Sequence, residues 1–212
     1  MEPGFWQARW ENNLIGFHEG KPNAFLEQHF ASLGLAPGAR VFVPLCGKTR
    51  DIAWLLGHGF KVAGAELSPI AVEQLFAELG VAPAKTPTGA LTHYGAEGID
   101  IFQGDIFELT AEILGPVDAI YDRAALVALP PAMRERYARH LMGMTGRSPQ
   151  LLVAFAYDQS ALDGPPFSVP PAEVRAHYEG AYTITELASE PVPGGLKGQC
   201  EATEHAWRLS RP

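Results

Sequence analysis

The sequence has few cysteines and lacks the motifs of two large enzyme classes. Cys46 and Cys200 are its only cysteines in 212 residues, too few for a disulfide framework and typical of a reducing compartment. None of its seven histidines stands in a metal-binding pattern such as His-Glu-x-x-His, so we expect no metal ion. A Gly-x-Ser-x-Gly nucleophile turn is also absent, which argues against a serine hydrolase.

Positive charge and long apolar runs are scarce as well. The chain has 16 lysines and arginines against 24 aspartates and glutamates, a net charge of −8, and no basic cluster. Because nucleic-acid binding requires a positive surface, we expect no nucleic-acid partner. No apolar run approaches the length of a membrane span, and Met1–Trp6 lacks the basic and apolar regions of an export signal. We therefore expect no membrane association and a cytoplasmic location.

Size and composition favour one α/β domain. A chain of 212 residues, 47% of them apolar, is large enough to bury a substantial core and too short for a second full domain. We expect residues 1–212 to form one domain, with residues 1–39 as an N-terminal helical extension. A monomer is the expected state.

Strand-like runs alternate with helix-like segments along the chain. The expected central strands are Val41–Pro44, Lys61–Glu66, Ile99–Gln103, Val117–Tyr121 and Leu151–Tyr157, and the helices between them are Arg50–Leu56, Ser68–Leu79 and Pro131–Met142. Ser68 is a typical N-cap, and Pro69 suits the first helical position. This alternation predicts a mostly parallel sheet with helices on both faces.

The C-terminal part of the chain has a different pattern. After a helix near Pro171–Tyr178, strands at Tyr182–Leu187 and Ala202–Leu209 flank a turn rich in proline and glycine, Pro191–Gly195. Strands that are joined in this way pair antiparallel. We therefore expect a hairpin-like pair added to the parallel sheet.

The most informative motif is Arg40–Lys48, which reads Arg-Val-Phe-Val-Pro-Leu-Cys-Gly-Lys, followed by Glu66 at the end of the next strand. A strand, a tight turn, a helix, a second strand and an acid outline a nucleoside-binding βαβ unit. An ionised carboxylate only accepts hydrogen bonds, and its two oxygens suit two neighbouring ribose hydroxyls. We therefore expect Glu66 to bind a ribose, the alternative being a plain connection and a solvated carboxylate.

Three nucleoside ligands compete for such a site, and the turn discriminates between them. NAD requires the glycines of Gly-x-Gly-x-x-Gly, but Gly47 is the only glycine between Arg40 and Leu56. Gly47-Lys48-Thr49 resembles the end of an ATP-binding phosphate loop, but Phe42 stands where that motif needs its first glycine. A nucleoside ligand without phosphates remains, and S-adenosylmethionine is the obvious one.

Aromatic residues are frequent before the first strand. Trp6 and Trp10 are four residues apart and share one helical face, and Phe17 and His18 follow them. Such a stripe either packs in the core or forms a lid whose aromatic faces close over a cationic sulfonium and exclude water. The sequence leaves both open.

Taken together, these residues resemble the thiopurine S-methyltransferase family. The matching stretches cover nearly the whole chain in order, namely Trp6-x-x-x-Trp10, Gly16–His18, Val41–Lys48, Gly64–Ser68, Tyr121–Ala128 and Gly164–Phe167. The Pro-Leu-Cys-Gly-Lys turn is unusual among methyltransferases, so the match is specific. The resemblance implies the α/β, Rossmann-like fold of class I methyltransferases, with a mostly parallel seven-stranded sheet, helices on both faces and an antiparallel C-terminal strand.

The family's cofactor is S-adenosylmethionine, and the resemblance implies where it would bind. Glu66 would take the ribose hydroxyls, Leu45 the methionine part and Leu67 the adenine. The other implied cofactor residues are Trp6, Trp10, Asp105, Ile106, Phe107 and Arg123. A helix cap is an equally good reading of Asp105.

The resemblance also implies the side of the methyl acceptor. Arg123 would be the catalytic residue and would contact the acceptor, because an arginine fork suits a carboxylate or another anion. Phe17 and Phe167 would contact the acceptor too. A salt bridge with Asp122 or another acid is the plain alternative for Arg123. Eukaryotic members have an arginine before the last strands, and Gly194–Lys197 offers none, which leaves the identity of the acceptor open.

The leading function is methyl transfer to sulfur in small aromatic or heterocyclic thiols such as thiopurines, with selenium and tellurium compounds as further acceptors. An aromatic thiol ionises near neutral pH, so a strong protein base is not required. An O- or N-methyltransferase would need a better base than the sequence offers. Asp122 could act as a base but is better explained as a structural carboxylate at a strand end, and His18 is either part of the lid or a surface or capping imidazole. A nucleotide-cofactor oxidoreductase and a non-catalytic nucleoside-binding module are the alternatives from other classes.

Overall fold

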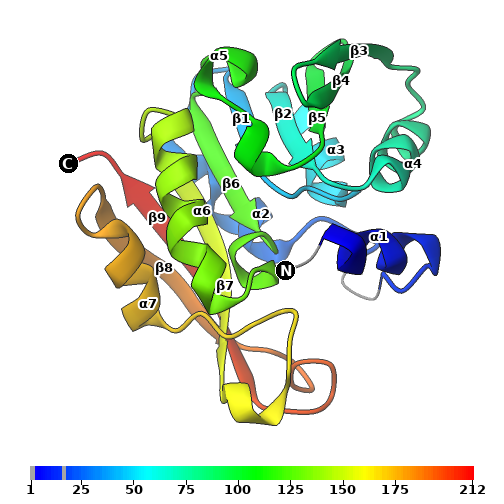
Figure 1. Ribbon diagram of the computed structural model, residues 1–212. Coiled ribbons are helices and arrows are strands. Elements are labelled where there is room, and N and C mark those ends of the chain that lie inside the picture. The colour runs from blue at the N-terminus through cyan, green and yellow to red at the C-terminus, as the bar shows by residue number, and fades with distance from the viewer. Residues whose placement is uncertain (1–2, 16–17) are drawn as a thin grey trace.

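Short apolar strands form the parallel centre of a nine-stranded sheet in the computed structural model, which describes residues 3–15 and 18–212 (Figure 1). The strand order is β3-β4-β5-β2-β1-β6-β7-β9-β8. The parallel strands are β1 (Arg40–Val43), β2 (Lys61–Glu66), β5 (Ile99–Gln103), β6 (Ala119–Arg123) and β7 (Gln150–Tyr157). Val41, Phe42 and Val43 are at most 1% exposed, because a central parallel strand is covered on both faces.

The fold class is confirmed, but the sheet has nine strands among the described residues instead of seven. The additional strands are the hairpin of β3 (Ala84–Thr88) and β4 (Leu91–Ala96), which pairs antiparallel with β5. β3 has little signal in the sequence, because its residues are mostly exposed and include Pro87, which only an edge strand tolerates well.

The expected C-terminal strand pair is confirmed at the other edge. β9 (Ala202–Ser210) pairs antiparallel with β7, and β8 (Thr183–Pro191) pairs antiparallel with β9. The turn between β8 and β9 brings Leu196 and Lys197 to the end of the sheet where the cavity described below lies.

The predicted helices are present, with local reasons for their starts. They are α3 (Arg50–Gly57), α4 (Pro69–Leu79), α6 (Pro131–Met144) and α7 (Pro171–Tyr178). The Thr49 and Ser68 side chains cap α3 and α4 by accepting hydrogen bonds from backbone N–H groups, as expected for N-cap residues. The remaining helical segments are α1 (Pro3–Glu11), α2 (Ala24–His29), η1 (Phe30–Leu33), η2 (Ile106–Glu108), α5 (Ala111–Leu114), η3 (Leu126–Ala128) and η4 (Gln159–Ala161). No helix within residues 3–15 and 18–212 has the length and hydrophobicity that crossing a bilayer requires.

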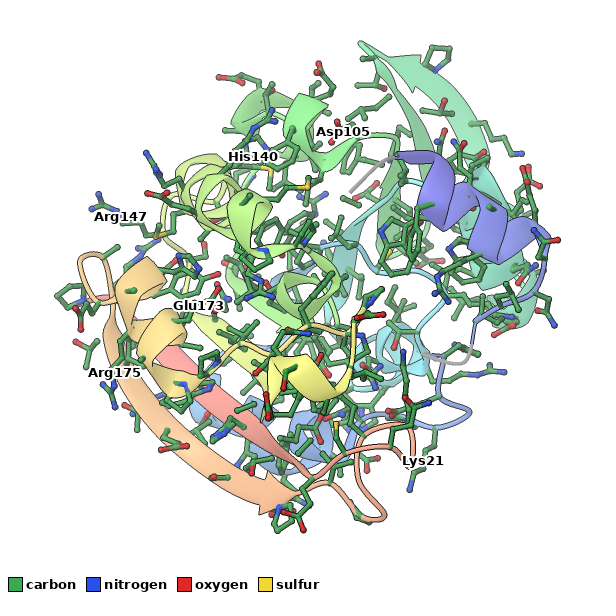
Figure 2. The ribbon with its side chains drawn as sticks, turned by 60° about the horizontal axis from the view of Figure 1, so that its bottom comes forward. Lys21, Asp105, His140, Arg147, Glu173 and Arg175 are labelled. Carbon is green, nitrogen blue, oxygen red and sulfur yellow. The ribbon has the colours of Figure 1, made fainter. Side chains whose placement is uncertain are left out.

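The sheet separates two apolar clusters, one on each face. One cluster includes Tyr137 of α6 and Tyr178 of α7, and the other includes Phe25 of α2, Ile52 of α3 and Phe76 of α4. At one end of α6, Nε2 of His140 lies 2.8 Å from the carbonyl oxygen of Ile106, next to Asp105 (Figure 2). The helices therefore also support the loops that follow the strands.

The strand order changes direction between β1 and β6. β2 and β5 lie on one side of β1, and β6 and β7 lie on the other. In open α/β sheets ligands bind at such a switch point, outside the carboxyl ends of the strands. The fold thus marks the connections after β1, β2, β5 and β6 as the place to look for a site.

Candidate functional site

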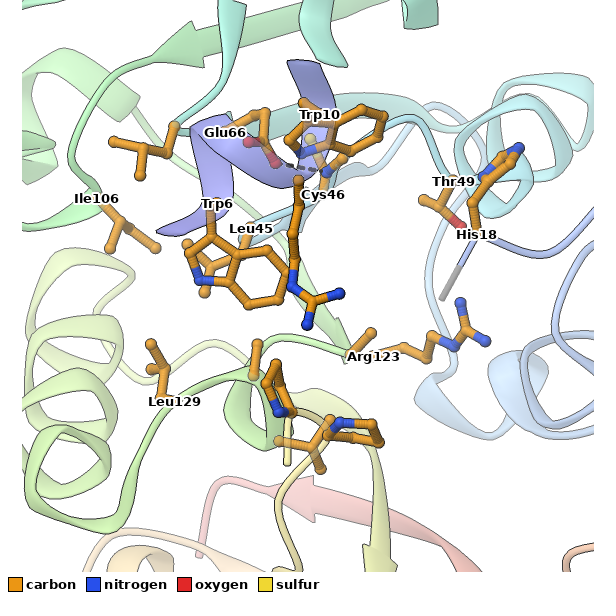
Figure 3. A pocket seen from close by; sticks show the side chains of 18 of the residues that line it. Trp6, Trp10, His18, Leu45, Cys46, Thr49, Glu66, Ile106, Arg123 and Leu129 are labelled. Carbon is orange, nitrogen blue, oxygen red and sulfur yellow. Dashed lines mark hydrogen bonds between the residues drawn. The ribbon is translucent and has the colours of Figure 1, made fainter. Parts of the chain in front are cut away.

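A cavity of about 580 Å3 lies at this switch point, between α1 and the carboxyl ends of the strands (Figure 3). Its size falls in the usual range for small-molecule sites. One part of its lining follows β1, β2 and β5, and we call it the β2 side; it comprises Leu45–Thr49, Glu66, Leu67 and Gly104–Phe107. The other part, the β6 side, comprises Arg123, Ala124, Val127–Leu129, Phe155, Pro165, Pro166, Leu196 and Lys197. α1 contributes Trp6, Arg9 and Trp10.

On the β2 side, the Glu66 carboxylate holds the turn that follows β1. Its Oε2 accepts a hydrogen bond from the Gly47 N–H at 2.8 Å, and its Oε1 accepts one from the Ser68 N–H at 2.7 Å. Glu66 is only 6% exposed and still lines the cavity. An ionised carboxylate can accept about four hydrogen bonds, so Glu66 keeps acceptor capacity for hydroxyl groups in the cavity.

Burial raises the pKa of Glu66, because a carboxylate loses its hydration there, and the N–H groups of Ser68, Gly47 and Leu67 oppose that shift. Backbone donors favour the charged form of an acid. These bonds therefore stabilise a buried carboxylate that faces a ligand site.

The turn also allows α1 to pack closely. Gly47 has φ of 53°, and a Cβ atom there would lie 3.3 Å from Cζ2 of Trp10, a buried residue. Leu45 has φ of 46°, which is unusual for a residue other than glycine. Trp6, one helical turn before Trp10, lines the same cavity. The lid reading is thus compatible with the structure, because both indole rings border the cavity.

Lys48 does not point its charge at a phosphate site. Its Nζ donates a hydrogen bond to Glu78 of α4 at 2.8 Å, and Arg50 approaches the same carboxylate at 3.3 Å. In a phosphate-binding loop the lysine would instead reach the ligand's phosphates. The ion pair with Glu78 therefore agrees with the exclusion of ATP from the sequence.

The loop after β5 completes the β2 side. Asp105 accepts a hydrogen bond from the Phe107 N–H at 3.0 Å and so caps η2, and it also lines the cavity. Both readings of Asp105 thus fit its position. Gln103, which the sequence did not single out, donates from Nε2 to the Leu67 carbonyl at 2.9 Å. This bond joins the end of β5 to the loop after β2, and only the pairing of the two strands reveals it.

At the end of β6, Asp122 and Arg123 face opposite ways, as neighbours on a strand do. Arg123 lines the cavity and forms an ion pair with Glu19, which also lines it. Asp122 is fully buried and accepts hydrogen bonds from Tyr137 Oη at 2.7 Å and the Leu126 N–H at 3.1 Å. Burial raises the pKa of Asp122 to about 6. Asp122 is thus a structural carboxylate, and Arg123 alone faces the site.

The electrostatics of the Arg123 region keep the guanidinium charged. Burial alone would lower the pKa of Arg123, but Glu19, Tyr121 and Asp51 outweigh that effect and raise it overall. His18 also lines the cavity, and burial together with Lys48 lowers its pKa. Both effects favour the neutral imidazole of His18, which is the form that accepts a proton.

The β6 side is mostly apolar. Val127, Leu129 and Phe155 contribute side chains, and Lys197 closes one edge by donating from Nζ to the Pro165 carbonyl at 2.8 Å. Burial lowers the pKa of Lys197, and Arg9 adds to that effect. Leu196 and Lys197 lie in the segment where the sequence offered no arginine, so a lysine borders the cavity there.

Phe167 is not among the described residues that line the cavity. The ring packs beside Gly164, where a Cβ atom would lie 2.6 Å from Cδ1 of Phe167, and its centroid is 5.7 Å from Cζ of Arg134. Pro165 and Pro166 line the cavity in its place. Two neighbouring residues on one loop can face opposite ways, and a sequence motif does not show which of them faces inward.

The cavity collects the nine residues that the sequence proposed for the cofactor: Trp6, Trp10, Leu45, Glu66, Leu67, Asp105, Ile106, Phe107 and Arg123. Phe17 lies outside the described residues. The additional lining residues Met133 and Arg136 come from α6, and no pattern in the sequence indicated which face of that helix would border the site.

Comparison with known proteins agrees with this geometry. The family model described as thiopurine S-methyltransferase matches residues 1–209. A thiopurine S-methyltransferase from Xanthobacter autotrophicus is 68% identical over 212 residues, which is 100% of both chains. One from Gluconobacter oxydans is 52% identical over 206 residues, covering 97% of this chain and 94% of the other.

Solved structures share the fold at low sequence identity. A Burkholderia thailandensis 1,6-didemethyltoxoflavin-N1-methyltransferase with bound S-adenosylhomocysteine has a TM-score of 0.66 at 16% identity, covering 98% of this chain and 87% of that one. The Synechocystis magnesium protoporphyrin IX methyltransferase has a TM-score of 0.63 at 13% identity, covering 99% and 100%. The full-length sequence matches go further than these likenesses, and they show that the chain belongs to the thiopurine S-methyltransferase family of S-adenosylmethionine-dependent enzymes.

Proposed function

We propose that this methyltransferase acts on the sulfur of small aromatic or heterocyclic thiols, such as thiopurines. The observation that carries the proposal is the composition of the β6 side, where the guanidinium of Arg123 stands among mostly apolar side chains and Lys197 closes one edge. An apolar wall suits an aromatic ring, and a guanidinium stabilises an anionic sulfur beside it.

The β2 side fits the adenosine of S-adenosylmethionine. Glu66 would accept hydrogen bonds from the ribose hydroxyls, since its oxygens keep free lone pairs after binding Gly47 and Ser68. Leu67, Ile106 and Phe107 would border the adenine, and Leu45, Trp6 and Trp10 would border the methionine part. When bound, S-adenosylmethionine supplies an activated methyl group.

On the β6 side, the protein's own contribution is to hold and orient the acceptor. Arg123 lowers the cost of a thiolate, and the apolar wall of Val127, Leu129 and Phe155 excludes water from it. Correct positioning of two reactants supplies about 7 to 11 kcal/mol of a barrier. A thiol that is already ionised therefore needs no strong base, and the same holds for selenols and for tellurium compounds of similar charge.

Transfer to oxygen or nitrogen is the second candidate, and one observation favours it. His18 borders the cavity with a lowered pKa, and a neutral imidazole accepts a proton from a hydroxyl or amine. Asp122 does not serve as that base, because it is fully buried and bonded to Tyr137. Sulfur transfer remains the first proposal because it does not depend on His18.

The organisation of the chain supports a lid and a simple assembly. Trp6 and Trp10 of α1 line the cavity, so we propose that α1 is a lid that closes over the bound cofactor. We also propose that residues 1–212 form a single domain, with residues 1–39 as its N-terminal extension. The net charge of −8 disfavours polyanions. We further propose that the protein works as a monomer in the cytoplasm, on a small-molecule thiol and without a nucleic-acid partner.

Transfer of labelled methyl from S-adenosylmethionine to matched acceptors tests the function. The panel pairs thiophenol with phenol and aniline, and a thiopurine with the corresponding oxopurine. The proposal expects label in the thiols, with little in their oxygen and nitrogen counterparts. Label in phenol or aniline that is lost in a His18→Ala variant would support the second candidate, and no transfer to any thiol would overturn the first.

A further inference from the structure

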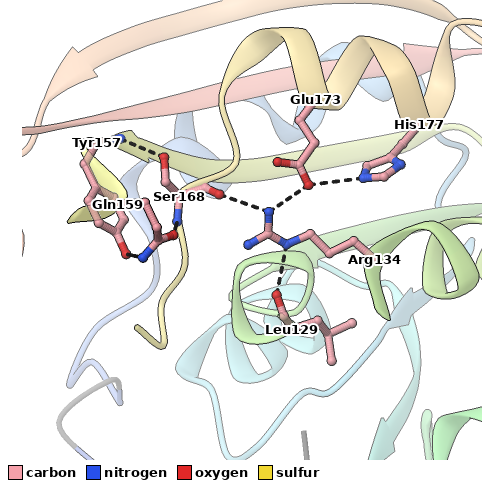
Figure 4. Close-up of polar contacts among 7 residues, drawn as sticks. All are labelled: Leu129, Arg134, Tyr157, Gln159, Ser168, Glu173 and His177. Atoms are coloured by element: carbon pink, nitrogen blue, oxygen red, sulfur yellow. Dashed lines mark hydrogen bonds and ion pairs between the residues drawn. The ribbon is translucent and has the colours of Figure 1, made fainter. Parts of the chain in front are cut away.

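Arg134 of α6 is a buried charge that lies outside the cavity. Figure 4 shows its polar contacts. It is 1% exposed. Burying a guanidinium is costly unless hydrogen bonds and an opposite charge compensate it. What Arg134 binds therefore indicates why the fold keeps it.

The guanidinium of Arg134 joins three separate segments. Its Nε donates to the Leu129 carbonyl at 2.9 Å, and its Nη1 donates to the Ser168 carbonyl at 3.0 Å. Nη1 also pairs with Oε1 of Glu173 on α7 at 2.7 Å, and His177 lies 3.3 Å from the same oxygen. Arg134 thus connects the segment after η3, the loop before α7, and α7 itself.

Two of these segments form the wall of the β6 side. Leu129 lines the cavity directly. Pro165 and Pro166 also line the cavity, and they precede Ser168 on the same loop. Phe167, which lies between Pro166 and Ser168, donates its backbone N–H to the Val127 carbonyl at 2.7 Å. A shift of the Ser168 carbonyl would therefore move this wall, although Arg134 does not touch the cavity.

Polar side chains also join the two ends of the loop that runs from Tyr157 to Ser168. Tyr157 Oη donates to the Pro166 carbonyl at 2.6 Å, and Ser168 Oγ accepts from the Tyr157 N–H at 3.0 Å. The Gln159 side chain accepts from the Ser168 N–H at 2.8 Å. Arg134 supplies the fixed end of this network, because it ties the Ser168 carbonyl to α6 and, through Glu173, to α7.

Cohesion of the helices does not by itself require this charge. Tyr137, Leu141, Val174 and Tyr178 are fully buried between α6, α7 and the sheet. A planar fork adds direction, since it binds its acceptors only in a fixed geometry. The network therefore sets positions more than it adds apolar contact.

We infer that Arg134 is a positioning residue for the methyl acceptor, which fixes the spacing between Leu129 and Pro165–Pro166 and leaves cofactor binding untouched. The inference rests on the proposed function, because it takes the β6 side as the acceptor side. The hydrogen-bond partners of Arg134 within the described residues are Leu129, Ser168 and Glu173, and none of them belongs to the β2 side.

The test compares Arg134→Lys, Arg134→Met and Glu173→Gln with the exposed control Arg139→Met on the same helix. Calorimetry with S-adenosylhomocysteine gives the affinity of the β2 side. Thiophenol kinetics give kcat and KM, and hydrogen exchange reports the amides of Phe167, Val169 and Gly47. The calorimetry and the exchange do not depend on turnover.

We expect Arg134→Met to raise the KM for thiophenol by about tenfold or more, with S-adenosylhomocysteine affinity within about twofold of wild type. The KM for thiophenol should rise less in Arg134→Lys than in Arg134→Met, and Glu173→Gln should also show a smaller rise. Exchange should quicken at Phe167 and Val169 but stay unchanged at Gly47.

Unchanged KM and exchange in both Arg134→Lys and Glu173→Gln would overturn the inference, even if Arg134→Met does not fold. The inference would also be overturned if S-adenosylhomocysteine affinity weakened by the same factor as the KM for thiophenol rose, since this would show general destabilisation. If the wild-type protein transfers no methyl group to thiols, the proposed function is wrong. The exchange data would still decide whether Arg134 holds the loop.

Discussion

The two sides of the cavity are built in different ways. On the β2 side, Glu66 binds Ser68, two residues away, and Gly47, 19 residues away, within one strand, turn and helix unit. On the β6 side, Arg134 binds Ser168 and Glu173, which are 34 and 39 residues away in different elements. The first side is held mainly by local backbone donors, and the second by side chains that join distant segments.

This difference bears on what each side can do. A site built from backbone groups of one βαβ unit keeps its shape when surrounding residues change, and it suits a ligand that never changes. A wall built from loops and side chains can alter with few substitutions. We therefore expect substitutions on the β2 side to affect the cofactor, and those on the β6 side to affect the acceptor.

The largest expected effect is at Arg123, where the two sides meet. Arg123→Lys replaces a planar fork with a point charge, and we expect kcat/KM for thiols to fall roughly 100-fold, about 3 kcal/mol. S-adenosylhomocysteine affinity should fall much less. Steady-state kinetics beside the exposed control Arg139→Lys measure this. Wild-type turnover in Arg123→Lys would remove the residue from the mechanism.

Glu66→Ala tests the β2 side alone. The change removes an acceptor of ribose hydroxyls and leaves the N–H groups of Gly47 and Ser68 without their partner. We expect S-adenosylhomocysteine binding to weaken by about 1 to 3 kcal/mol. Calorimetry measures it, with the exposed Glu97→Ala as control. Unaltered affinity would refute the ribose assignment, and a change confined to the KM of the thiol would reverse the two sides.

Gly47→Ala tests whether the β2 side depends on backbone conformation. The new Cβ would sit at φ of 53° and 3.3 Å from Trp10, so we expect a loss of about 1 to 2 kcal/mol in the free energy of unfolding. Denaturant titration measures it. Gly57→Ala is the matched control, because nothing lies within 4 Å of a Cβ atom there. An equal effect at both glycines would contradict the close packing of α1 on the turn.

Asp122 should affect stability without affecting either ligand. Its pKa is about 6 in the folded chain, above the usual value, so the folded state binds its proton more tightly than the unfolded state. The contribution of Asp122 to the free energy of unfolding therefore falls by about 1 kcal/mol as pH rises from 5 to 7. In Asp122→Asn the fall should disappear, while S-adenosylhomocysteine affinity stays the same.

Urea unfolding of wild type and Asp122→Asn at both pH values provides the measurement. Other acids titrate equally in the two proteins, so the difference isolates Asp122. A parallel pH dependence in both would show that this carboxyl is not the one that burial perturbs.

The same contrast explains what the sequence could predict. The turn at Arg40–Lys48 and the acid Glu66 follow from local rules about strands, caps and glycines, and the central strands agree with prediction closely. β6 is the exception, starting at Ala119 and not at Val117, because the apolar run begins before the strand pairs. The hairpin of β3 and β4 was missed, since β3 is an edge strand whose mostly exposed residues resemble a loop, and β4 pairs with it.

The β6 side was harder to predict because its geometry depends on contacts between distant residues. The motif Gly164–Phe167 was noticed, but the inward residues are Pro165 and Pro166. Arg134 appeared in the sequence only as one more arginine on a helix. Glu19, the ion-pair partner of Arg123, had no signal either, because the two residues are 104 positions apart and no sequence pattern pairs them.

A crystal structure of the protein with S-adenosylhomocysteine and an unreactive thiol analogue tests the central claim most directly. The account expects both ribose hydroxyls within hydrogen-bond distance of the Glu66 carboxylate, and the analogue between Arg123 and the wall formed by Leu129 and Pro166. A ribose bound elsewhere, with Glu66 bonded only to Gly47 and Ser68, would contradict it.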